Sequence, residues 1–72
     1  MNTHYEELAN AIILQAVKDY RDALKKIKKY GKDKDAENTK RECETFFRSG
    51  WYHALTQVDG EMLISALQAE VA

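Results

Sequence analysis

The chain contains no proline, three glycines and a single cysteine among its 72 residues. Because the glycines stand far apart, at Gly31, Gly50 and Gly60, the turns that separate the strands of a β-protein are almost absent. The lone Cys43 cannot form an internal disulfide, so a reducing cytoplasm is the expected compartment. These scarcities argue against a β-sheet fold and against a disulfide-stapled secreted domain.

Long apolar runs are also missing. None approaches the roughly 18 residues that a membrane-spanning helix needs, and charged residues make up 32% of the chain. The first residues lack the basic and apolar regions of a signal peptide, and none is expected. We therefore expect one cytoplasmic domain, residues 1–72, with no membrane partner and a core small enough to leave little margin of stability.

The strongest pattern in the sequence is a helical repeat of apolar residues. Apolar residues recur at intervals of three and four between Tyr5 and Tyr30, which predicts one long amphipathic helix. Thr3 with Glu6 has the spacing of a capping box, and Gly31 is suited to end the helix. The apolar positions are Tyr5, Leu8, Ala9, Ile12, Ile13, Ala16, Val17, Tyr20, Ala23, Leu24, Ile27 and Tyr30.

Three shorter helices are predicted after a polar linker. The first runs from about residue 35 to 48 with Asp35 as its cap, the second over 51–56 with Ser49 as its cap, and the third follows Asp59. The apolar stripe of the third comprises Met62, Leu63, Ala66, Leu67 and Val71. The predicted fold is all-α, a compact small helical domain in which three shorter helices pack back on one long N-terminal helix.

The packing centre is expected where aromatic residues cluster. Phe46, Phe47, Trp51 and Tyr52 would face Ile12, Ile13 and Val17 of the long helix. A helix of about 26 residues spans about 39 Å, and the shorter helices need not cover all of it. A homodimer through the uncovered part is therefore an alternative.

Charge is distributed unevenly along the chain. Residues 1–17 carry a net charge of −2, residues 18–34 one of +5 and residues 35–72 one of −4. The uneven distribution allows a basic and an acidic patch to meet different partners, although pairing between them within the chain is the simpler interpretation.

Catalytic motifs are absent from the sequence. Cys43 and His53 stand ten residues apart without further ligands at metal spacing, and Ser49-Gly50 lacks the context of a nucleophile elbow. No phosphate loop or dinucleotide-binding motif occurs. We expect a non-enzyme with no cofactor and no metal.

Two binding surfaces are candidates. A nucleic-acid backbone could lie along the basic face of the long helix, while Tyr20 and Tyr30 at core-facing positions are poor base-stacking residues. A protein partner could instead meet the acidic second half, the aromatic run after Gly50, or one leucine on the polar face. The nucleic-acid candidates are Lys18, Arg21, Lys25, Lys28 and Lys29; the protein-binding candidates are Glu42, Glu44, Tyr52, His53 and Leu14.

Most of the chain carries a resemblance to a known group of proteins. The segments 11–21, 46–52 and 55–60, above all Phe46-Phe47-Arg48-Ser49 and the downstream Asp59-Gly60, resemble small uncharacterised helical proteins encoded by phages and conjugative elements of Firmicutes. The resemblance implies a mobile-element protein acting in the cytoplasm of a bacterial host. By analogy with other short phage proteins that lack enzymatic motifs, we expect the protein to bind and inhibit a host nucleic-acid-processing or defence protein, such as a nuclease, in the manner of an anti-CRISPR protein. A small accessory nucleic-acid-binding protein that uses the basic face of the long helix is the alternative.

Overall fold

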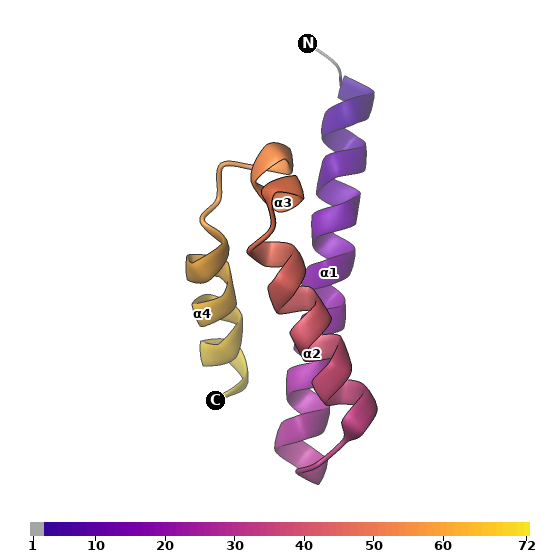
Figure 1. Ribbon diagram of the computed structural model, residues 1–72, viewed down its shortest axis with the longest axis vertical. Coiled ribbons are helices and arrows are strands. Elements are labelled where there is room, and N and C mark those ends of the chain that lie inside the picture. The colour runs from indigo at the N-terminus through magenta and orange to yellow at the C-terminus, as the bar shows by residue number, and fades with distance from the viewer. Residues whose placement is uncertain (1–2) are drawn as a thin grey trace.

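Four helices make up the part of the chain that the computed structural model describes, residues 3–72 with the side chains of residues 4–72 (Figure 1). They are α1 (Thr3–Tyr30), α2 (Lys34–Phe47), α3 (Gly50–Leu55) and α4 (Gly60–Val71). No strand occurs within residues 3–72, so the predicted all-α fold is confirmed.

The helices form an elongated bundle of 45 × 19 × 19 Å (Figure 1). α2 runs antiparallel to α1, α3 turns the chain at the top of the bundle, and α4 descends in the direction of α1. The first turns of α1 extend beyond α3. The long helix thus serves as the support on which the three shorter ones pack, as the sequence predicts.

The helix ends follow local chemistry with one correction. Gly31 adopts a left-handed φ of 77°, and its N–H donates to the Ile27 carbonyl at 2.8 Å, which ends α1 as expected. The α2 cap is Asp33, whose carboxylate accepts from the Ala36 N–H at 3.1 Å; the prediction of Asp35 was wrong because α2 begins at Lys34 and places Asp35 in its first turn.

The other two caps are those predicted. Ser49 caps α3 by accepting from the Tyr52 N–H, and Asp59 caps α4 by accepting from the Glu61 N–H. The capping role expected of Thr3 falls on a side chain outside the described residues.

Three aromatic side chains form the centre of the core. Tyr20, Phe47 and Tyr52 are completely buried, and the Phe47 ring meets each tyrosine ring edge-to-face at a centroid distance of 5.7 Å. Trp51, expected in this cluster, is 59% exposed. Because neighbouring residues of a helix point about 100° apart, the inward placement of Tyr52 directs Trp51 outward, where its ring contacts Phe46 edge-to-face.

Gly60 brings α4 close to the end of α2. A Cβ atom added at Gly60 would lie 2.0 Å from the backbone oxygen of Phe47, so only glycine permits this approach. In the packed α4, Ile64 and Leu67 are buried, whereas Met62, predicted in the apolar stripe, is 69% exposed. Ala66, also in the predicted stripe, is exposed, and Leu63 and Val71 are partly buried.

Large apolar side chains near both ends of α1 are exposed, although α2 runs beside its C-terminal end (Figure 1). Tyr5, Leu8 and Tyr30 are exposed although the periodicity placed them on the packing face. At the C-terminal end the Lys29 ammonium lies 5.3 Å from the centre of the Tyr30 ring. Within residues 3–72, none of the four helices combines the length and the apolar character that a membrane crossing requires.

Candidate functional site

The basic candidates divide into side chains that hydrogen-bond to α4 and side chains that do not. Lys18, Lys25 and Lys29 are exposed along one stripe of α1. The Arg21 guanidinium binds the Glu70 carboxylate with two hydrogen bonds of 2.7 and 3.1 Å. Lys28 donates to the carbonyl of Val71 at 2.6 Å. Two of the five predicted nucleic-acid contacts therefore hold α4 against α1 and are not available in full to a phosphate backbone.

Glu44, a predicted protein contact, is occupied within the fold. Its carboxylate accepts from the Tyr20 hydroxyl at 2.6 Å and pairs with Lys40 at 2.9 Å. Partial burial acts to raise its pKa, but the hydrogen bonds from Tyr20 and Lys40 outweigh burial and lower the pKa below the usual value. Burial, together with the neighbouring Glu44, raises the pKa of Tyr20 to about 12. Glu44 is therefore better described as part of the core boundary than as a contact surface.

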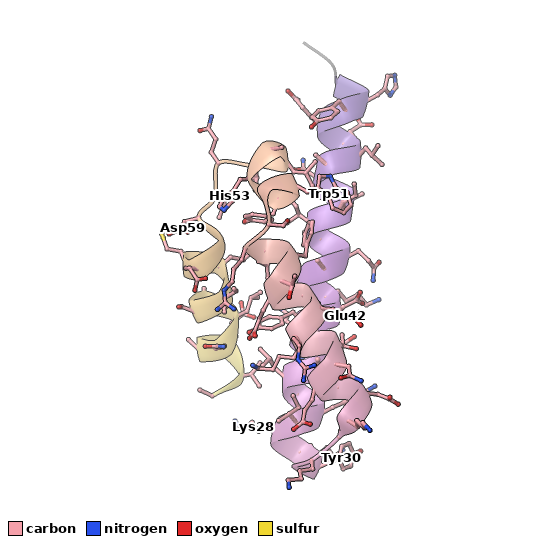
Figure 2. All side chains as sticks on the ribbon, viewed as in Figure 1. Lys28, Tyr30, Glu42, Trp51, His53 and Asp59 are labelled. Carbon is pink, nitrogen blue, oxygen red and sulfur yellow. The ribbon has the colours of Figure 1, made fainter. Side chains whose placement is uncertain are left out.

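Tyr52 and His53 occupy different environments. Tyr52 is 0% exposed, as expected of the packing centre, so it is not available as the protein contact also considered for it, and its hydroxyl has no hydrogen-bond partner among the described residues. His53 is exposed, and Figure 2 shows it on the α4 side of α3, with its ring 5.7 Å from that of Tyr52. The displayed aromatic residue of this run is Trp51, on the side of α3 that faces α1 (Figure 2).

An open apolar hollow lies beside Trp51, where α1 meets α2 and α3. It has a volume of about 470 Å³ and is walled chiefly by carbon. The small side chains of Ala11 and Ala16 leave room above α1, while Phe46 and Trp51 form the opposite wall. The lining residues are Ala11, Ile12, Gln15, Ala16, Asp19, Glu42, Cys43, Phe46 and Trp51.

A second, more polar hollow continues the first toward the α1–α2 turn. The two share Asp19 and Glu42, and the second adds Asp22 and Asp35 together with Lys26. We call the two together the α1–α2 groove. Glu42, a predicted protein contact, lies at the junction of its apolar and acidic parts.

Leu14 stands on the other flank of the bundle. It is 65% exposed, as predicted, and lines a separate hollow between α1, α3 and α4 with Val58 and Thr56. Leu14 and Glu42 therefore belong to different surfaces, and a single small partner would not cover both in one groove.

The lone cysteine lies in the wall of the apolar hollow. Burial raises the pKa of the Cys43 thiol to about 11, with Asp19 and Glu42 adding to the shift, so the thiol is protonated at neutral pH. Among the side chains of residues 4–72, no group of three or more His, Cys, Asp and Glu residues could hold a metal ion. What the arrangement offers is an apolar recess with charged edges, which suits binding.

The sequence named Glu42, which lines the groove, as a candidate, but it did not predict the groove itself. The walls of the groove come from three helices. Whether Trp51 or Tyr52 is the exposed side chain depends on how α3 is rotated about its axis. Comparison of the chain with protein-family models, with curated proteins and with solved structures gave no match.

Proposed function

We propose that this chain is a non-enzymatic interaction protein of a phage or mobile element that binds and inhibits a host protein. The observation that carries the proposal is the exposed Trp51 beside the apolar half of the α1–α2 groove. Tryptophan is enriched among the residues that dominate binding energy at protein interfaces. A partly exposed tryptophan next to an apolar recess supplies both an anchor and a place for the partner's side chain.

The class of host protein is suggested by the charge of the groove. Asp19, Asp22, Asp35 and Glu42 give its lower part a negative potential. Proteins that bind nucleic acids present positive channels, which such a surface can occupy. A nucleic-acid-processing or defence nuclease in the bacterial cytoplasm is the proposed target, and the proposed mobile-element origin rests on the sequence resemblance.

Affinity capture from a bacterial host lysate tests the proposal. Tagged wild-type protein and the Trp51→Ala and Met62→Ala variants are compared by quantitative mass spectrometry. Both side chains are exposed and apolar, but only Trp51 lines the groove. We expect a partner that Trp51→Ala loses and Met62→Ala retains, and whose purified activity falls when the wild-type protein is added. Equal capture by all three proteins, or no effect on the partner's activity, contradicts the proposal.

A nucleic-acid-binding function is the second candidate, and one observation favours it. Lys18, Lys25 and Lys29 are exposed on one stripe of α1 and form none of the hydrogen bonds that hold α4. If this stripe binds phosphates, Lys25→Glu with Lys29→Glu should abolish a gel shift and flatten its salt dependence. If the protein acts through the groove, the same pair should leave inhibition unchanged.

A further inference from the structure

The α1–α2 groove has a definite length and polarity. Its apolar part begins near Ile12 and its acidic part includes Asp22, ten residues later on α1, which corresponds to about 15 Å along the helix. Trp51 stands at the apolar end and Asp35 at the acidic end. A helical segment of about ten residues has this length.

The apolar end has the form that receives a helix. Ala11 and Ala16 present only methyl groups, so they make a floor between the larger walls of Phe46 and Trp51. A groove of this kind accepts the apolar face of an amphipathic helix through residues spaced three or four apart.

The acidic end is available for charge pairing. Ion pairs among the described residues join Arg21 to Glu70, Lys40 to Glu44 and Arg48 to Glu61, and so leave out all four groove carboxylates. These carboxylates are Asp19, Asp22, Asp35 and Glu42, and one cation, Lys26, lies among them.

We propose, on the basis of the function proposed above, that the groove binds an amphipathic helix that is apolar at one end and rich in Lys or Arg at the other. The apolar residues of this helix lie beside Trp51, and its cations lie against Asp22, Asp35 and Glu42. A nucleic acid does not fit this surface, because the same carboxylates repel phosphate. The negative charge of the groove thus favours a partner helix with Lys or Arg at one end, and it also determines how that helix lies along the groove.

The fluorescence of Trp51 can be used to measure binding, because Trp51 is the only tryptophan in the chain. The probe is a tryptophan-free helical peptide of about 15 residues with two leucines four positions apart and three lysines on the same face beyond them. The control peptide has glutamate in place of each lysine. Covering the exposed indole should shift its emission to shorter wavelength.

We expect the lysine peptide to bind at least roughly tenfold more tightly than the glutamate peptide at low salt, with the difference shrinking in about 0.5 M salt. Asp35→Lys with Glu42→Lys should reverse the preference, since both side chains are exposed and line the groove. Glu6→Lys with Glu7→Lys makes the same change of net charge outside the groove and should leave the preference intact.

Equal binding of the two peptides, or no emission shift with either, overturns this inference. If Trp51→Ala nevertheless loses a captured host protein, the proposed function stands and only the helix specificity fails. An emission shift that grows with protein concentration without peptide, together with a dimer in sedimentation equilibrium, would assign the groove to a second copy of the chain and also contradict the inference.

Discussion

The hydroxyl of Tyr20 on α1 donates a hydrogen bond of 2.6 Å to the carboxylate of Glu44 on α2. The same hydroxyl accepts from the Gln68 amide of α4 at 3.1 Å. One phenol oxygen therefore joins three helices at the edge of the core, where the ring of Tyr20 is completely buried. The Tyr20 hydroxyl should therefore contribute to stability, and deleting this one oxygen atom removes both hydrogen bonds.

Tyr20→Phe should lower the free energy of unfolding by about 1–3 kcal/mol, because two partners lose their hydrogen bond and one of them is charged. Urea unfolding at neutral pH, followed by circular dichroism, measures the change. Tyr52→Phe is the matched control, since its buried hydroxyl has no hydrogen-bond partner among the described residues. We expect that control to be neutral or slightly stabilising; equal losses in both variants would contradict the role assigned to the junction.

Alkaline pH should weaken the fold through the same group. The pKa of Tyr20 is raised from 10.0 to about 12 in the folded protein. Between these values the unfolded chain loses the proton and the folded chain keeps it, so stability is full below about pH 10 and declines toward pH 12. The loss from this group is about 2–3 kcal/mol. Unfolding measured at several pH values should show a shallower alkaline decline in Tyr20→Phe than in the wild type.

Gly60→Ala should destabilise the protein by about 1–3 kcal/mol or more, because the new Cβ atom would collide with the Phe47 carbonyl. Alanine would otherwise favour a helix, so the sign of the effect tests the close approach of α4 to α2. Gly50→Ala has no heavy atom within 4 Å of the added Cβ and should be neutral or slightly stabilising. Thermal unfolding of the two variants separates these outcomes.

Trp51→Ala should cost only about 1 kcal/mol, the value of one aromatic contact with Phe46 and a partly covered ring. Removing a fully buried aromatic side chain costs about 3–5 kcal/mol, and Tyr52→Ala should fall in that range. A large loss of stability in Trp51→Ala, measured by urea unfolding, would mean that the indole belongs to the core.

Cys43 should react slowly with an alkylating reagent in the native protein at neutral pH. Its thiol is buried, and its pKa of about 11 leaves little thiolate. The reaction, followed by mass spectrometry, should accelerate in urea when the side chain becomes accessible. Rapid modification without denaturant would show that the α1–α2 groove opens easily.

The number, order and type of the helices could be predicted from the sequence because local signals determine them. The left-handed Gly31 and the caps Ser49 and Asp59 act within a few residues of their own position. The prediction of Asp35 as the N-cap of α2 was wrong because Asp33 and Asp35 both lie in one short linker, and either aspartate could cap the helix as far as the sequence pattern shows.

The surface was harder to predict because exposure depends on helices that are distant in sequence. Periodicity placed Tyr5, Leu8 and Tyr30 on a packing face, but the first turns of α1 extend beyond α3, and the side chain of Tyr30 in the last turn is exposed. The groove likewise depends on the rotation of α3, which exposes Trp51 and buries Tyr52. Pairing of Arg21 with Glu70 joins residues 49 positions apart, a partnership that charge patterning along one helix does not reveal.

The junction at Tyr20 also limits how the chain can be divided. Because α1, α2 and α4 each supply one of the three hydrogen-bonded side chains, deleting α4 would expose Tyr20 and Phe47 as well as remove Gln68. A piece of the protein without α4 therefore does not retain the complete core.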